Sequence, residues 1–466
     1  MNTILNGLIP RPVRIMPLDG RFPALALKSI YVSDALRRFG IRVMTAFKYY
    51  GKELQVHAED KADIILDLDS SLGPESWRID IRSKGIQIIG GNEAGLFYAI
   101  SALEQLLAMA FARGLVQAAF DCGTIEDKPC FEWRGLMLDS ARHFQSKDKI
   151  KEVIRLIAQA RLNVFHWHLV DNQGWRIPSS IVQGWGDMDA GQYSREDIKE
   201  IIAFAAEHFV RIVPELDMPG HSGGLLRRFP QYACDPQNPG GEFCLGNPEG
   251  RKFLKALLSE LMELFPASSV IHIGGDEADT VAWNKCPKCC QAMQSAGLKQ
   301  MCELENQFMN EMTRHVVSCG RRPMVWCTGA THPVDTIVHT WQSVNEILHT
   351  HTLGNPMVNS VHYSCYFDYP ANSEDPRCNW MPELSEESVY NMFDVNQETQ
   401  SVLGAEACLW TEMVPEWRVI SKIAPRLMVF SERAWSRPEH KDWHDFQRRK
   451  AQLESVGYRE FLGRSG

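Results

Sequence analysis

The chain has 466 residues, 44% of them apolar and 23% charged, which is enough for two or three domains with full hydrophobic cores. A formal net charge of -9 argues against nucleic acid or an anionic membrane surface as a partner. No apolar stretch reaches the roughly 20 residues that a membrane span requires. The N-terminus lacks the basic segment and long apolar run of a signal peptide, so we expect a cytoplasmic location.

Strands and one helix are predicted in the first 125 residues. Residues 62–68 are typical of a strand, and 77–82 and 85–90 alternate around a short turn as a β-hairpin does. Apolar residues at helical spacing predict a helix over 94–112. We therefore expect a small α+β domain over 1–125, in which no motif indicates chemistry.

The pattern then changes to an alternation of strands and helices. Ser194 to Asp197 has the composition of a capping box at the start of one such helix. Alternation of this kind implies a parallel sheet, and eight units fit a (β/α)8 TIM barrel over 126–466. An open doubly wound sheet is the alternative, which the lack of a G-x-G-x-x-G fingerprint after the first strand disfavours. The eight predicted strands are 136–139, 163–170, 211–215, 269–273, 323–326, 335–341, 357–361 and 401–406.

The thirteen cysteines indicate free thiols in a reducing compartment. Cys286, Cys289 and Cys290 stand close together in the sequence, as zinc ligands do. A structural zinc site needs four ligands, and no second CxxC follows at a suitable spacing. We therefore expect reduced structural thiols and no metal, with a zinc knuckle as the lesser alternative.

Two adjacent carboxylates, Asp276 and Glu277, follow two glycines where the strand 269–273 ends. In a barrel the active site lies at the C-terminal strand ends, and a carboxylate pair is the minimum equipment for hydrolysing a glycosidic bond. Tryptophans beside acidic groups are typical of a sugar site, because sugar C–H faces pack on indole rings. Other candidates at predicted strand ends are Asp139, Arg142, Asp171, Glu215, Asp217, His221, Trp326, Trp341, Tyr366, Asp368 and Trp410, with Arg134 near the start of the first strand.

Six ordered motifs resemble the β-N-acetylhexosaminidases of glycoside hydrolase family 20. The resemblance implies an exo-acting enzyme that needs no cofactor and removes terminal non-reducing GlcNAc or GalNAc from an amino-sugar glycoside. It also implies a retaining reaction in which the substrate's own acetamido oxygen attacks, giving an oxazolinium intermediate. The motifs occupy 133–144, 165–176, 214–221, 272–277, 366–368 and 409–412, and the first 125 residues resemble the small domain that commonly precedes the barrel.

The resemblance also implies a role for each site residue. Glu277 would be the general acid and then the base, and Asp276 would hold the acetamido N–H. Asp171 and His221 would form a polar relay toward Glu277. The substrate-binding residues would be Arg134, Trp326, Trp341, Tyr366, Asp368, Trp410 and Glu412; for Arg134 and Glu412 a structural ion pair is the alternative.

Two other functions remain open at the level of the sequence. His166 and His168 lie on one face of a strand, as in barrel metallohydrolases whose zinc activates water. A carbohydrate-binding protein on a decayed barrel is the non-enzymatic reading, which the intact Asp276–Glu277 pair disfavours. Arg134, Asp368 and Glu412 could serve either sugar epimer, so the sequence does not decide between GlcNAc and GalNAc. Exposed apolar residues on an outer helix would support a homodimer.

Overall fold

The computed structural model describes residues 3–59, 61–182, 191–392 and 401–458. The chain divides into two compact units. The N-terminal unit comprises residues 1–132, 159–161 and 428–466, and the barrel unit comprises residues 133–158 and 162–427.

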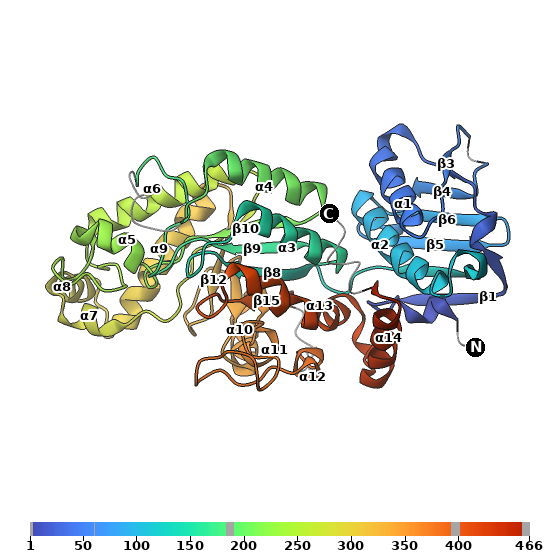
Figure 1. Cartoon of the computed structure of the whole chain (residues 1–466). Coiled ribbons are helices and arrows are strands. Elements are labelled where there is room, and N and C mark those ends of the chain that lie inside the picture. The colour runs from blue at the N-terminus through green and yellow to red at the C-terminus, as the bar shows by residue number, and fades with distance from the viewer. Residues whose placement is uncertain (1–2, 60, 183–190, 393–400, 459–466) are drawn as a thin grey trace. The chain divides into compact units, whose positions relative to one another are not determined.

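The N-terminal unit is built on a seven-stranded mixed sheet of order β1-β7-β5-β6-β4-β2-β3 (Figure 1). Strands β5 and β6 pair as the predicted antiparallel hairpin, with Trp77 opposite Gly90. Helix α2 is buried along nearly its whole length and contacts β5 and β6, as its apolar sequence requires. The elements are β1 (Arg14–Pro23), β2 (Ser29–Tyr31), α1 (Arg37–Tyr49), β3 (Gln55–Val56), β4 (Ile64–Leu68), β5 (Trp77–Arg82), β6 (Gly85–Gly90), α2 (Glu93–Ala110), β7 (Ala119–Asp127) and α14 (Trp443–Ser455).

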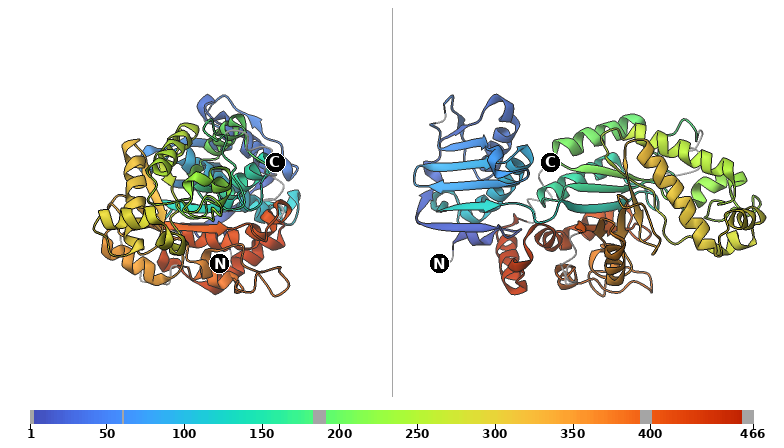
Figure 2. Two further views of the ribbon diagram at one scale, coloured as in Figure 1. Left: turned by 90° about the vertical axis from the view of Figure 1, so that its left-hand side faces the viewer. Right: turned by 180° about the vertical axis from the view of Figure 1, so that it is seen from behind.

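The barrel unit confirms the predicted TIM barrel. Eight parallel strands close in the order β10-β11-β12-β13-β14-β15-β8-β9, and helices surround them (Figure 2). The strands are β8 (Trp133–Asp139), β9 (Val164–His168), β10 (Arg211–Glu215), β11 (Val270–His272), β12 (Arg322–Trp326), β13 (Ile337–Thr340), β14 (Met357–Asn359) and β15 (Val402–Leu409).

The helices around the barrel begin where the sequence supplies start signals. Ser194 and Asp197 form the predicted capping box at the start of α4. The principal helices are α3 (Lys147–Gln159), α4 (Arg195–Glu207), α6 (Pro248–Leu264), α9 (Met301–Ser318), α10 (Val344–Leu353) and α13 (Val419–Trp435). Short helices lie in the longer connections: α5 (Gly223–Arg228) after β10, α7 (Thr280–Lys285) and α8 (Pro287–Ser295) after β11, and α11 (His362–Cys365) and α12 (Glu386–Tyr390) after β14.

The interior of the barrel has an apolar layer and a polar layer. Val164, Val213 and Val270 belong to the apolar cluster; Val164 and Val270 begin their strands, and Val213 lies in the middle of β10. Because side chains alternate along a strand, the next inward residues lie two positions further on. On β9, β10 and β11 these are buried His and Glu residues. The polar layer therefore lies directly beneath the C-terminal strand ends.

Among the described residues, no helix combines the length and apolar character that crossing a bilayer requires.

Candidate active site

A tight turn after β11 carries the two adjacent carboxylates. Gly274 and Gly275 have φ values of +68° and +111°, in the left-handed region that favours glycine. A Cβ on Gly274 would lie 1.6 Å from Oδ1 of Asp217. That same oxygen accepts a hydrogen bond from the Gly275 N–H at 3.2 Å. The two glycines thus allow the turn to pack against Asp217. The packed turn fixes the backbone positions of Asp276 and Glu277.

Asp276 and Glu277 have different surroundings, although both approach one imidazole. Their carboxylate oxygens each lie 3.7 Å from Nε2 of His221. The Asp276 side chain is 10% exposed and that of Glu277 is 60% exposed. Burial raises the pKa of Asp276, although the neighbouring His221 opposes the shift. One carboxyl is therefore enclosed by protein, while the other faces solvent.

A chain of buried polar groups contacts the Nδ1 side of the His221 ring. Its Nδ1 lies 3.3 Å from Oδ1 of Asp171, whose Oδ2 lies 3.0 Å from Nε2 of His168. The other ring nitrogen of His168 bonds to Glu215. Burial alone would lower the pKa of His221, but the carboxylates of Asp276 and Asp171 outweigh it and raise the pKa to about 10. The predicted pairing of Asp171 with His221 is present, and it extends two residues further into the barrel.

Arg142 places a guanidinium among the carboxylates of the site. Its Nη1 lies 3.3 Å from Asp139, and its Nη2 lies 2.8 Å from Asp171 and 3.8 Å from Glu412. The guanidinium carbon lies 4.9 Å from the centre of the Trp410 ring, which is a cation–π contact. Asp139 also accepts hydrogen bonds from the N–H groups of residues 141, 142 and 411, so the loops after β8 and β15 are tied together.

Arg134 lies near the start of its strand, as the sequence indicates, and this is the opposite end from the other candidates, so its position does not favour the predicted contact with the sugar. Arg134 is the second residue of β8 and pairs with Ala405, whereas Asp139 ends the strand. Five residues at about 3.3 Å each place the Arg134 backbone about 16 Å from Asp139. The rule that site residues follow strand ends applies instead to Arg142, which the sequence interpretation did not assign to the substrate.

Two of the aromatic candidates, Trp326 and Tyr366, lie close to Trp410. Trp326 ends β12, donates from Nε1 to Oε1 of Glu215 at 2.8 Å, and lies 5.9 Å from Trp410 between ring centres. The Tyr366 ring lies 6.2 Å from Trp410. Trp341 follows β13, and its Nε1 donates to the Cys327 carbonyl at 3.0 Å, directly after β12. The predicted aromatic residues therefore share the C-terminal end of the barrel with the acidic ones.

Asp368 follows the short helix α11 and is 2% exposed. Within the described parts of the chain, neither of its carboxylate oxygens has a hydrogen-bond partner of normal geometry, and the same holds for Oδ1 of Asp276. Burial raises the pKa of Asp368 to about 8, and the charge of Glu412 acts in the same direction. A buried polar group without a partner costs about 1–3 kcal/mol, so a ligand with hydroxyl or amide groups would relieve both residues.

His166 and His168, the alternative metal pair, lie in the polar layer of the barrel. His166 lies 2.7 Å from Glu406 and 3.2 Å from Glu215. His272 bonds to the other oxygen of Glu215 at 2.9 Å. These imidazoles are fully buried and supported by carboxylates, and through His168 they hold Asp171. The sequence interpretation missed this role, because a strand pattern does not show which inward residues meet.

Comparison with known proteins matches both units. The model of the glycosyl hydrolase family 20 catalytic domain matches residues 131–438, and that of domain 2 of the same family matches residues 6–128. A β-hexosaminidase of Akkermansia muciniphila is 29% identical over 415 residues, covering 82% of this chain and 83% of that protein. A β-N-acetylhexosaminidase of Cellulomonas fimi is 28% identical, covering 97% and 95%.

Solved structures agree with these relatives. An exo β-N-acetylglucosaminidase from Vibrio harveyi in complex with N-acetylglucosamine has a TM-score of 0.86 at 25% identity, over 98% of this chain and 78% of that one. A Streptomyces plicatus β-hexosaminidase in complex with GlcNAc has a TM-score of 0.84 at 26% identity, over 98% and 96%. The chain therefore belongs to glycosyl hydrolase family 20, and it is a glycoside hydrolase.

Proposed function

We propose that this glycoside hydrolase is an exo-acting β-N-acetylhexosaminidase that releases terminal non-reducing GlcNAc or GalNAc. The reaction would retain the anomeric configuration and use the substrate's acetamido oxygen as nucleophile. The relatives named β-hexosaminidase and the neighbours solved with GlcNAc support the substrate class.

The contact of both carboxylates with one imidazole carries the mechanistic proposal. Asp276 and Glu277 both lie 3.7 Å from Nε2 of His221. In a two-carboxylate retaining glycosidase, the acid and the nucleophile flank the scissile bond. Neighbouring residues that share an imidazole approach a substrate from one side. The nucleophile must then come from elsewhere, and an acetamido oxygen is the group that an N-acetyl sugar supplies.

Each step of this reaction has a group to carry it. The acetamido oxygen bonds to the anomeric carbon while the glycosidic C–O bond breaks and Glu277 gives its proton to the leaving oxygen. Asp276 accepts a hydrogen bond from the acetamido N–H and offsets the positive charge of the oxazolinium ring. Water then adds to the anomeric carbon, Glu277 takes its proton, and the ring opens to restore the acetamide. His221 lies beside both carboxylates and orients them.

The remaining residues would hold the sugar. Arg142 and Glu412 would bind ring hydroxyls together with Asp368, whose buried oxygens lack partners within the described chain. Tyr366 would donate its hydroxyl to the acetamido oxygen. Trp326, Trp341 and Trp410 would surround the acetyl group and exclude water from it. Recognition of hydroxyls by this cluster suits a terminal sugar, which is the basis for exo action.

Nitrophenyl β-glycosides of N-acetyl, N-fluoroacetyl, N-difluoroacetyl and N-trifluoroacetyl glucosamine test the proposal. Each fluorine weakens the amide oxygen as a nucleophile, so we expect kcat/KM to fall steeply along the series. A flat series would show that the protein supplies the nucleophile. No turnover of either the gluco or the galacto N-acetyl substrate would overturn the proposed activity itself, and full activity in a strong chelator would argue against metal-activated water.

Glu277→Gln should lower kcat by about 10²–10⁴-fold on substrates with poor leaving groups. The loss should be smaller with a nitrophenolate, which leaves without a proton. Asp279→Asn is the matched control, because Asp279 lies in the same segment and caps α7 through the Val281 N–H. Equal losses on all leaving groups would contradict the acid role of Glu277.

A further inference from the structure

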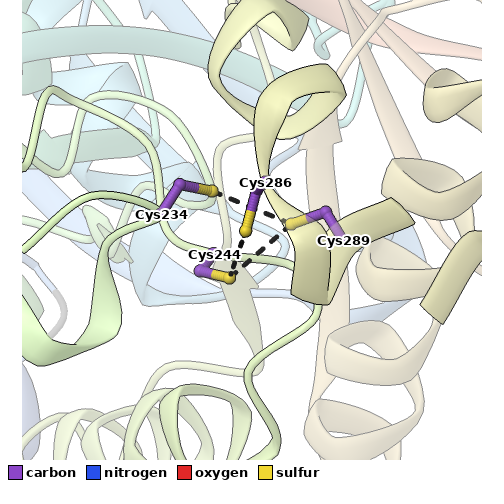
Figure 3. Close-up of side chains that lie close together, drawn as sticks. All are labelled: Cys234, Cys244, Cys286 and Cys289. Carbon is purple, nitrogen blue, oxygen red and sulfur yellow. Dashed lines mark hydrogen bonds between the residues drawn. The ribbon is translucent and has the colours of Figure 1, made fainter. Parts of the chain in front are cut away.

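Four cysteines from two separate loops of the barrel unit meet in one cluster (Figure 3). Cys234 and Cys244 lie in the connection from β10 to α6, and Cys286 and Cys289 stand at the start of α8. All four Sγ atoms lie within 4.8 Å of one another. The shortest separations are 3.6 Å for Cys244–Cys289, 3.7 Å for Cys244–Cys286 and 3.8 Å for Cys234–Cys289.

These separations match a tetrahedral metal site. Zinc binds thiolate sulfur at about 2.3 Å, which places sulfurs at tetrahedral corners about 3.8 Å apart. A disulfide would require about 2.05 Å. Three of the four cysteines are buried and Cys234 is half-buried, so the cluster presents four soft ligands and no open position. A closed set of this kind is typical of a structural site rather than a catalytic one.

The surroundings of the cluster favour thiolates. The Gly246 N–H donates to Sγ of Cys289 at 3.4 Å, the kind of outer hydrogen bond that orients metal ligands. A Cβ on Gly246 would lie 2.2 Å from the Lys288 carbonyl oxygen, so glycine is what lets the loop approach α8 so closely. Pro287 occupies the first turn of α8, whose free N–H groups favour negative charge nearby.

We propose that Cys234, Cys244, Cys286 and Cys289 bind one zinc ion that joins the two loops carrying His221 and Glu277. Unliganded thiols were expected because no second CxxC follows Cys286 in the sequence. The partner cysteines lie upstream and on another loop, so only the folded chain brings the four together.

The ion would strengthen a connection that hydrogen bonds already begin. The Trp283 Nε1 donates to the Phe243 carbonyl at 2.8 Å, across the same two loops. The Phe243 N–H in turn donates to the Pro219 carbonyl at 2.9 Å, two residues before His221. Because the free energy of metal binding becomes folding free energy, zinc would hold both loops in place. Its role is positioning, since it contacts no reacting atom.

Metal analysis of the full-length protein, purified without chelators, tests the proposal. We expect one zinc per chain, and X-ray absorption at the zinc edge should show four sulfur neighbours at about 2.3 Å. Cys289→Ser should lose the zinc. Cys290→Ser is the matched control, because that neighbouring thiol faces the Trp283 and Asn284 carbonyls instead of the cluster and should keep the full zinc content.

Wild-type protein without zinc, whether its thiols are free by titration or paired in disulfides by mass spectrometry, would overturn the proposal. So would iron in place of zinc, nitrogen or oxygen neighbours at the metal edge, or equal zinc loss in both variants. These readouts on wild-type protein decide the matter even if Cys289→Ser fails to fold. They are independent of turnover, so their failure is distinct from failure of the proposed hydrolase function. Removal of zinc should also speed hydrogen exchange over 229–247 and 277–290, and unchanged exchange would refute the positioning role.

Discussion

Arg142 joins four other side chains of the site. Its guanidinium contacts the carboxylates of Asp139, Asp171 and Glu412 and lies over Trp410. These four residues lie at or after the C-terminal ends of three different strands, β8, β9 and β15. A planar fork with five N–H donors can serve several acceptors at once, and an ammonium group cannot reproduce that geometry.

Arg142→Lys should therefore lower kcat/KM by about 10- to 100-fold, the effect of losing one hydrogen bond to a charged group. Steady-state kinetics on a nitrophenyl N-acetyl glycoside, with Tm measured beside it, checks this. Arg134→Lys is the contrast: it should lower Tm yet leave the kcat/KM of folded protein near that of the wild type. A larger kinetic loss at Arg134 than at Arg142 would contradict the assignment of Arg142 to the sugar.

The sequence predicted the acidic residues better than the basic one. Asp276, Glu277, Asp171 and His221 were found because each follows a strand end, and the structure brings them together. The same rule selects Arg142, whereas the family resemblance pointed to Arg134, which lies near the start of the strand. The sequence placed Asp217 only among the strand-end candidates and His168 only in a possible zinc pair. Their contacts with Gly275 and Asp171 were not predicted, because these depend on how neighbouring strands align.

The turn at 274–277 is the element on which the two carboxylates depend. Two other residues of the site loops, His221 and Glu277, each have φ of +49°, so both loops are strained where they meet. A left-handed conformation costs a residue with a Cβ roughly 1–2 kcal/mol. Strain of this kind persists only where the surroundings hold it, as Asp217 does for this turn.

Gly274→Ala should lower both Tm and kcat, because its Cβ would displace Asp217 and with it the carboxylate pair. Gly329→Ala is the matched control: its φ is +76°, but a Cβ there would meet no atom within 4 Å. That control should lose only about 1–2 kcal/mol of stability and keep its kcat. Thermal melts and steady-state kinetics on both variants distinguish the steric clash of a Cβ with Asp217 from the cost of backbone strain alone. Equal effects would show that the Asp217 contact is unimportant.

Elements with strong periodicity were predictable, and contacts between loops were not. The hairpin 77–82 and 85–90 agrees residue for residue with β5 and β6, since alternation fixes which face is buried. The meeting of Cys234 and Cys244 with Cys286 and Cys289 depends on two loops that fold after different strands. No spacing within either loop encodes it.

At the scale of the whole molecule, the barrel encloses a polar network instead of a purely apolar filling. His166, His168, Glu215, His272 and Glu406 are buried there together. Strands of a parallel barrel usually carry apolar residues inward, so the alternation predicted the barrel but not this filling. The network supports Asp171 and Trp326 from beneath, which links the folding of the core to the shape of the site.

Stability should fall at alkaline pH. Burial alone would lower the pKa values of His166 and His221, but neighbouring carboxylates outweigh it and raise them to about 9 and about 10. An unfolded histidine has a pKa near 6.5. The folded chain therefore keeps protons that the unfolded chain releases, so this stabilisation is complete below about pH 6.5 and is lost as pH rises through 9 to 10.

Thermal melts from pH 6 to pH 10 should show Tm decreasing steadily by several degrees. The raised pKa of Asp368, about 8, acts in the same direction because ionising a buried carboxyl opposes folding. His221→Gln should flatten the decline in its upper range. A Tm that stays constant or rises from pH 6.5 to pH 9.5 would show that these imidazoles are not protonated in the folded chain.

The double role of Trp326, in the barrel interior and in the proposed acetyl site, limits how this position can evolve. It is 1% exposed, bonds to Glu215 and stacks on His339 at 4.0 Å, yet it is also a proposed wall of the acetyl site. A substitution of Trp326 that changed which acyl group fits the proposed site would also disturb the packing of the barrel interior. Few substitutions are therefore tolerated at this position. Diversification is left to the outer loops, where Trp380 and Trp417 are 63% and 79% exposed. Substitutions at these exposed positions would leave the packing of the barrel interior unchanged, whereas substitution of Trp326 would not.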